Sequence, residues 1–148
     1  MKPMGIQPVE ILLIDDNPAD VLITKEALDG SAIVSNLHTA PDGVEAMAFL
    51  RKEGKHKDAP RPGLILLDLN LARKDGREVL AEIKSDEKLR RIPVVVLTAS
   101  KSAEDIRNAY GLHANCYVVK PENFEKFAEV VRHIEHFWFA VVKLPTKV

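Results

Sequence analysis

The chain has 148 residues, 46% of them hydrophobic and 29% charged, a composition ordinary for one soluble globular domain. Its 21 basic and 22 acidic residues leave a formal net charge of −1, which gives no support to nucleic acid or an anionic membrane as a partner. The single cysteine, Cys116, excludes an internal disulfide, and no apolar run approaches the ~20 residues of a membrane span. We therefore expect a cytoplasmic protein.

The predicted elements alternate between short apolar runs and amphipathic stretches. In chain order we expect a strand over Ile11–Ile14, a helix from Pro18 to a stop at Gly30, a strand over Leu37–Ala40, a helix over Gly43–Leu50, a strand over Leu64–Leu67, a helix over Gly76–Lys84, a strand over Pro93–Leu97, a helix opened by Ser102, a strand over Cys116–Val119 and a long helix capped by Asn123. Because the strands are apolar on both faces and separated by helices, the sheet should be parallel and covered on both sides. This indicates a single α/β domain over residues 1–148, with a core over about 9–139 and an extended C-terminal helix and tail over about 124–148.

Four polar residues, Asp15, Asp68, Thr98 and Lys120, each stand where an apolar run stops. In an open parallel sheet, ligands bind outside the carboxyl ends of the strands, so these side chains are expected to meet at one edge. Asp16 adds a third carboxylate, and three close carboxylates stay ionised only beside a cation. Oxygen ligands without histidine or cysteine favour Mg²⁺, or Mn²⁺ in its place, over zinc.

The remaining groups at this edge point to a phosphoryl ligand. Lys120 supplies a positive charge and Thr98 a hydroxyl donor. Asp68, central and next to the metal, is predicted to be the nucleophile, since carboxylates form aspartyl phosphates. Three other aspartates are interpreted as turn or capping residues: Asp20, Asp42 and Asp75.

Four motifs occur in order from about Val9 to about Phe139: Ile14-Asp15-Asp16-Asn17, Leu67-Asp68-Leu69-Asn70, Leu97-Thr98-Ala99 and Tyr117-Val118-Val119-Lys120-Pro121. With them the sequence resembles the receiver domain of two-component response regulators. The resemblance implies a flavodoxin-like (βα)5 sandwich with a parallel sheet of order 2-1-3-4-5, and a histidine kinase as phosphoryl donor. The site residues that it implies are Asp68 as phosphoacceptor, Asp15, Asp16, Asp68 and the backbone carbonyl of Asn70 as metal ligands, Thr98 and Tyr117 as a switch pair, and Asn70 and Ser100 as residues that tune the phosphoryl lifetime.

A narrower resemblance links Asp16-Asn17-Pro18-Ala19-Asp20 and Lys74-Asp75-Gly76-Arg77-Glu78 to the stand-alone regulators paired with bacterial phytochrome histidine kinases. The long loop ending Ala59-Pro60-Arg61-Pro62 agrees with it. One departure is Ala72, where these relatives usually carry proline; the change should loosen the loop after Asp68 slightly but removes no ligand. The family also implies a cis peptide bond before Pro121.

The last helix carries more apolar residues than one small sheet can cover. Six residues form a stripe at helical spacing that is expected to be core: Phe124, Phe127, Val131, Ile134, Trp138 and Val141. The aromatic run Phe137, Trp138 and Phe139 suggests a homodimer through this helix and its neighbours. The alternative is a tail that folds back on its own domain.

Two other functions stay open. A haloacid-dehalogenase-like Mg²⁺ phosphohydrolase also uses Asp, Thr, Lys and Mg²⁺, but it places a second Asp two residues after the nucleophile, where this chain has Asn70. A phosphorylation-independent pseudo-receiver is the other, and the intact acidic set argues against it. A receiver catalyses only its own phosphorylation and dephosphorylation, so it is not an enzyme acting on a separate substrate. With no DNA-binding module recognised, the output is expected to pass through protein contact.

Overall fold

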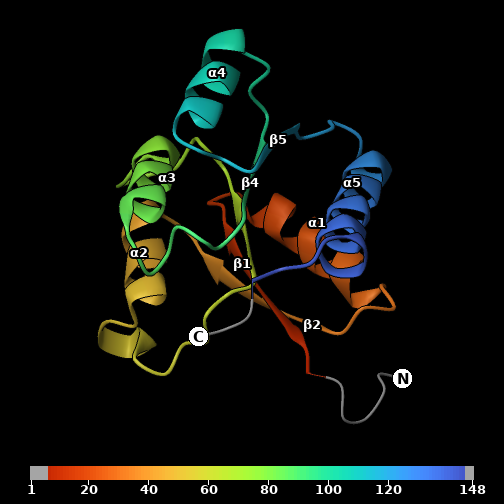
Figure 1. Cartoon of the computed structure of the whole chain (residues 1–148). Coiled ribbons are helices and arrows are strands. Elements are labelled where there is room, and N and C mark those ends of the chain that lie inside the picture. Colours follow the sequence, from red (N-terminus) through yellow and green to blue (C-terminus); the bar gives the residue numbers. More distant parts are fainter. Residues whose placement is uncertain (1–6, 146–148) are drawn as a thin grey trace.

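The computed structural model describes residues 7–145, which form one parallel sheet between two layers of helices (Figure 1). Its elements are β1 (Val9–Ile14), α1 (Pro18–Asp29), β2 (Ser35–Ala40), α2 (Gly43–Arg51), β3 (Leu64–Leu67), α3 (Gly76–Ser85), β4 (Val94–Thr98), α4 (Ala103–Gly111), β5 (Cys116–Val119) and α5 (Phe124–His136). The strand order is β2-β1-β3-β4-β5 and every neighbouring pair is parallel, which confirms the predicted fold class. Within these residues no helix is both long and apolar enough to cross a lipid bilayer.

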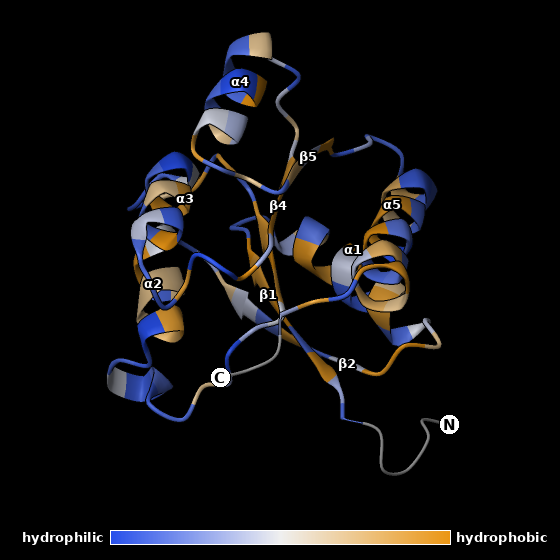
Figure 2. Cartoon of the chain, in the orientation of Figure 1, coloured by the Kyte–Doolittle hydropathy of each residue, from blue (hydrophilic) through white to orange (hydrophobic). Residues whose placement is uncertain are grey.

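The sheet separates two apolar clusters because successive strand residues point to opposite faces. In β1, Leu12 and Ile14 belong to the cluster under α2 and α3, while Ile11 and Leu13 belong to the cluster under α1 and α5. Every residue of β3 is buried, as a strand covered on both faces requires. Figure 2 shows the result as hydrophobic strands in the middle of the molecule and polar outer faces on the helices.

The helices begin where the sequence supplies capping side chains. The Asn17 side chain accepts hydrogen bonds from the first amides of α1, and Pro18 takes the first helical position. Asp42 and Asp75 cap α2 and α3, which confirms their interpretation as capping residues. These caps fix the loops between strand ends and helix starts, where the polar residues of interest lie.

The C-terminal helix departs from its predicted apolar stripe. Phe127, Val131 and Ile134 are buried, but Phe124 is 66% exposed and Val141 is 61% exposed, so the stripe is wrong at both ends. Phe124 is the first residue of α5. At the other end, a π-helical segment over Phe137–Val141 replaces the α-helical turn. Because a π-turn holds more residues than an α-turn, the spacing of 3.6 residues no longer predicts which side faces the sheet.

Candidate phosphoryl and metal site

The carboxyl ends of β1, β3, β4 and β5 bring the predicted side chains to one point. Lys120 Nζ lies 2.8 Å from Asp15 Oδ2 and 2.9 Å from Asp68 Oδ2. The Thr98 hydroxyl donates to Asp68 Oδ1 over 2.8 Å. Two strand-end bonds hold this register, from the Asp68 amide to the Ile14 carbonyl and from the Lys120 amide to the Thr98 carbonyl. Residues from four distant parts of the sequence therefore form one compact polar site.

Three carboxylates of this site could hold a metal ion together. Oxygen atoms of Asp15, Asp16 and Asp68 all lie within 4.8 Å of one another. Asp15 and Asp68 are 3% and 7% exposed, whereas Asp16 faces solvent, so an ion would keep water on one side. An all-oxygen, partly hydrated set fits a hard divalent cation such as Mg²⁺ or Mn²⁺. Asn70 follows Asp68 in the same loop, and its amide donates to Asp68 Oδ1 over 3.2 Å.

Lys120 supplies the positive charge inside the acidic cluster. Its side chain is 8% exposed. Burial by itself lowers the pKa of this ammonium, but its hydrogen bonds to Asp15, Asp20 and Asp68 outweigh burial and raise the pKa above the ordinary value. Burial raises the pKa of the Asp15 carboxyl, and the bond from Lys120 counteracts part of that rise. Lys120 therefore places a positive charge among these carboxylates.

Asp20 belongs to this site, although its sequence position suggested a turn residue. Its Oδ2 lies 2.8 Å from Lys120 Nζ, and the two residues are 100 positions apart in the chain. An acidic residue in the first turn of a helix is commonly explained by the helix dipole, so the position of Asp20 does not by itself indicate a contact with Lys120. The pairing becomes visible only in the folded chain, where α1 packs against α5 and Lys120 lies in the loop before α5.

The β4–α4 loop connects the site to α3 and α4. The Tyr117 hydroxyl donates to the Ser100 carbonyl over 3.0 Å, and the ring packs against the core. The Ser100 hydroxyl donates to Asp105 over 2.6 Å, and Arg77 of α3 also donates to Asp105 over 2.8 Å. The Thr98 hydroxyl thus points to the acidic site, and the Tyr117 hydroxyl points to the β4–α4 loop. Lys120 reaches the carboxylates although residues 7–145 contain no cis peptide bond, so the expected cis bond before Pro121 is absent.

The proposed interface residues do not share one environment. Phe137 is 50% exposed, whereas Trp138 and Phe139 are half-buried and pack against the cluster under α1 and α5. The ring of Phe137 meets Trp138 edge-on, with centroids 5.5 Å apart. Two of the three aromatic residues thus fold back on their own domain, which leaves Phe137 as the surface residue of the run.

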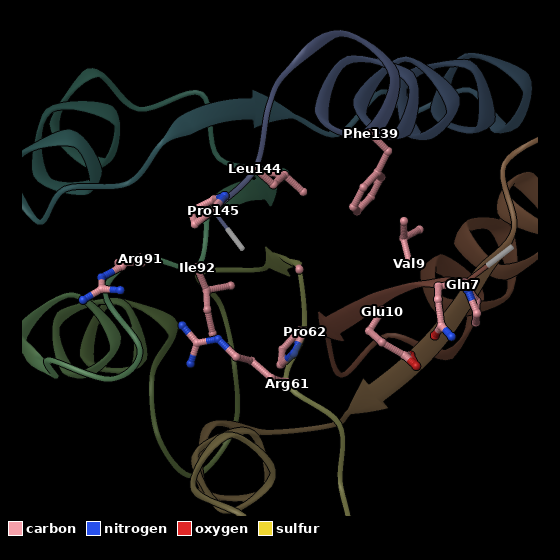
Figure 3. Close-up of a pocket in the computed structure, with 12 residues that line it drawn as sticks. Gln7, Val9, Glu10, Arg61, Pro62, Arg91, Ile92, Phe139, Leu144 and Pro145 are labelled. Atoms are coloured by element: carbon pink, nitrogen blue, oxygen red, sulfur yellow. The ribbon is translucent and has the colours of Figure 1, made fainter. Parts of the chain in front are cut away.

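A pocket of about 250 Å³ lies at the opposite end of the sheet, near the amino ends of β1, β3 and β4 (Figure 3). Phe139, Leu144 and Ile92 line it, with Arg61 and Arg91 at its side. None of its lining residues belongs to the acidic site. The pocket and the acidic site are therefore separate features at opposite ends of the sheet.

This fold and this edge define a receiver domain of a response regulator. The family model "Response regulator receiver domain" matches residues 11–132, and the chain belongs to that family. It is 50% identical over 138 residues to "Response regulator Rcp1" of Synechocystis sp., covering 93% of this chain and 94% of the relative. A crystal structure of the phosphorylated cyanobacterial phytochrome response regulator RcpA superposes with a TM-score of 0.92 at 51% identity, over 95% of this chain and 100% of RcpA. A crystal structure of the Mn²⁺-bound form of Rcp1 superposes with a TM-score of 0.90 at 50% identity, over 94% of this chain and 100% of that one. These likenesses give no support to a phosphohydrolase of the haloacid dehalogenase type.

Proposed function

We propose that Asp68 accepts a phosphoryl group from the phosphohistidine of a histidine kinase. The observation that supports this is the set of hydrogen bonds around Asp68. Its carboxylate accepts from Lys120 over 2.9 Å and from Thr98 over 2.8 Å, and the carboxylates of Asp15 and Asp16 lie beside it. An Asp68 carboxylate oxygen forms the new O–P bond. The P–N bond of the donor breaks, and the imidazole nitrogen keeps the electron pair. Lys120 and Thr98 then each bind an oxygen of the transferred group.

Mg²⁺ is the metal we propose for the site, with Asp15, Asp16, Asp68 and the Asn70 carbonyl as protein ligands. A bound divalent ion offsets negative charge on the transferring group. The oxygen-only donor set supports this choice, and the relative Rcp1 has been crystallised with Mn²⁺. Asn70 and Ser100 stand two residues after Asp68 and Thr98 respectively, and we assign them the control of the phosphoryl lifetime.

The signal is proposed to leave through the Thr98–Tyr117 pair. Tyr117 already bonds the Ser100 carbonyl of the β4–α4 loop, so a shift of Thr98 toward a phosphoryl oxygen would reach α4 through this loop. The surface of α4, β5 and α5 would then change its affinity for a partner protein. The chain would catalyse only its own phosphorylation and dephosphorylation, in the cytoplasm.

A bacterial phytochrome is the kinase class we propose, because the relative RcpA is described as a phytochrome response regulator. Phosphotransfer profiling against every histidine kinase of the source genome tests this. Fast transfer from a phytochrome kinase and slow transfer from the others is expected. Preference for a kinase without a phytochrome module would overturn the link while leaving the phosphoacceptor role intact.

The decisive test of the phosphoacceptor is Asp68→Asn. Incubation with acetyl phosphate and Mg²⁺ should give an acid-labile adduct on Asp68 in the wild-type chain and none in the variant. A pseudo-receiver would give no adduct in either chain, and a phosphohydrolase would turn over phosphomonoesters continuously. Asp42→Asn is the matched control, because Asp42 is also a buried carboxylate but caps α2. An adduct retained in Asp68→Asn would refute the assignment.

A further inference from the structure

A fourth carboxylate, from Asp20 in α1, binds the lysine of the site. Asp20 Oδ2 lies 2.8 Å from Lys120 Nζ, the same distance as Asp15 Oδ2. An ammonium group has three N–H donors, and Asp15, Asp20 and Asp68 accept all three. The carboxylates that cluster within 4.8 Å are Asp15, Asp16 and Asp68, without Asp20. Asp20 is therefore linked to the site through the lysine rather than through the ion-binding oxygens.

The backbone of Asp20 is fixed by the start of α1. Its amide donates to the Asn17 side chain over 3.2 Å, and its carbonyl accepts from the Thr24 hydroxyl over 2.8 Å. Its side chain is 20% exposed, so solvent screens the pair with Lys120 only in part. Asp20 thus offers the lysine an acceptor whose position is set by a helix, apart from the loops that carry Asp15 and Asp68.

The three carboxylates that bind Lys120 differ in whether they also bind the metal ion or accept the phosphoryl group. Asp15 and Asp68 both belong to the ion-binding set, and Asp68 is the proposed phosphoacceptor. Asp20 neither belongs to the ion-binding set nor accepts the phosphoryl group. It can therefore stay bonded to Lys120 in the metal-free, the metal-bound and the phosphorylated states. Four carboxylates and one ammonium leave a formal charge of −3 here, and a divalent ion brings it to −1 before the phosphoryl group arrives.

We propose that Asp20 is a positioning residue that holds the Lys120 ammonium against α1 and competes with the phosphoryl oxygens for it. This rests on the proposed function of Asp68. By occupying the lysine, Asp20 leaves Asp15 and Asp68 freer to bind the ion. By the same bond, it weakens the attraction between Lys120 and the phosphoryl group. Asp20 therefore favours the metal-bound, unphosphorylated state of the receiver.

The test is Asp20→Asn, followed by two titrations of the full chain. Mg²⁺ binding, measured alone by calorimetry, should weaken about three- to tenfold, the range of a partly screened ion pair. Binding of beryllofluoride, a phosphoryl analogue, at saturating Mg²⁺ should strengthen by about the same factor. These opposite shifts separate positioning from structural damage, because a disturbed site would lose affinity for both probes. Asp29→Asn, an exposed carboxylate at the other end of α1, removes the same charge and should change neither.

A double-mutant cycle shows whether Asp20 acts through Lys120. In a Lys120→Met background, Asp20→Asn should change beryllofluoride affinity less than twofold. A gain as large as in the wild-type background would mean direct repulsion and would overturn the proposal. No shift in either titration, or shifts of the same sign, would overturn it as well. A wild-type chain that binds Mg²⁺ but not beryllofluoride would overturn the proposed function itself, whereas normal wild-type binding with a silent Asp20→Asn would overturn this inference alone.

Discussion

Three carboxylates of the acidic site, Asp15, Asp20 and Asp68, depend on Lys120 for charge balance. The ammonium is 8% exposed and bonds three carboxylates that are themselves 2–20% exposed. Removing one member of a buried ion pair is costly because the charges left behind have neither water nor a partner. Local stability at this edge is therefore tied to a positive charge, from either the lysine or a metal ion.

Lys120→Met is expected to destabilise the metal-free chain by about 3 kcal/mol. Mg²⁺ should recover much of this loss, since the ion supplies charge to the same carboxylates. The variant should still bind Mg²⁺ but should bind beryllofluoride measurably more weakly, because the lysine serves the phosphoryl oxygens rather than the ion. Urea unfolding with EDTA and with Mg²⁺ gives the stabilities. Lys101→Met, an exposed lysine on the neighbouring loop, is the control. An equal loss of Mg²⁺ and beryllofluoride affinity would contradict the assigned role.

At the scale of elements, the connection between β3 and α3 leaves no room for a side chain at Gly76, the first residue of α3. A Cβ on Gly76 would lie 2.3 Å from the Asp68 carbonyl oxygen and 2.6 Å from Leu69 Cα. The Gly76 amide also donates to the Leu69 carbonyl over 3.0 Å. The first residue of α3 therefore fixes the backbone of the loop that carries Asp68.

Gly76→Ala is expected to cost at least ~2 kcal/mol, because backbone atoms rather than a flexible side chain must move. The displaced loop should also weaken Mg²⁺ binding. Gly111→Ala is the control: a Cβ there meets nothing within 4 Å, so the change should be neutral or slightly stabilising. Chemical unfolding and Mg²⁺ titration of both variants check this. A Gly76→Ala chain as stable as the wild type would show that the contact is not restrictive.

The bridge between α3 and α4 should make part of the stability depend on pH. Hydrogen bonds from Ser100, the larger contribution, and from Arg77 hold the pKa of the Asp105 carboxyl below its ordinary value of 3.8. A depressed folded pKa stabilises the fold above the unfolded pKa, and this contribution disappears as the pH falls through the folded value. Asp105→Asn should therefore be less stable than the wild type near pH 7, with the difference shrinking below about pH 4. Urea midpoints across this range measure it, with the exposed neighbour Glu104→Gln as control. A difference that stays constant with pH would contradict the mechanism.

For the whole molecule, the sequence predicts the elements that follow a regular hydrophobic pattern. It does not predict contacts that depend on how distant elements pack. Alternating apolar runs determine the order of strands and helices, and a parallel sheet brings strand ends together, so Asp15, Asp68, Thr98 and Lys120 are predictable. Asp20 was missed because its contact with Lys120 depends on how α1 packs against α5, the helix that follows Lys120. The exposure of Val141 was missed because a π-helical segment has no simple sequence signature.

Two aromatic residues of this C-terminal segment, Phe137 and Phe139, are expected to contribute differently to folding and to self-association. Phe139 packs on the core, so Phe139→Ala should cost about 2 kcal/mol. Phe137 is half exposed, so Phe137→Ala should change the stability by less than about 0.5 kcal/mol. If the chain pairs through α5, as the aromatic run of the sequence suggests, Phe137→Ala should instead weaken the dimer. Unfolding at low concentration and sedimentation equilibrium measure the two effects. A wild-type monomer with and without beryllofluoride would remove the dimer, and equal destabilisation by both variants would contradict the division of roles within this aromatic run.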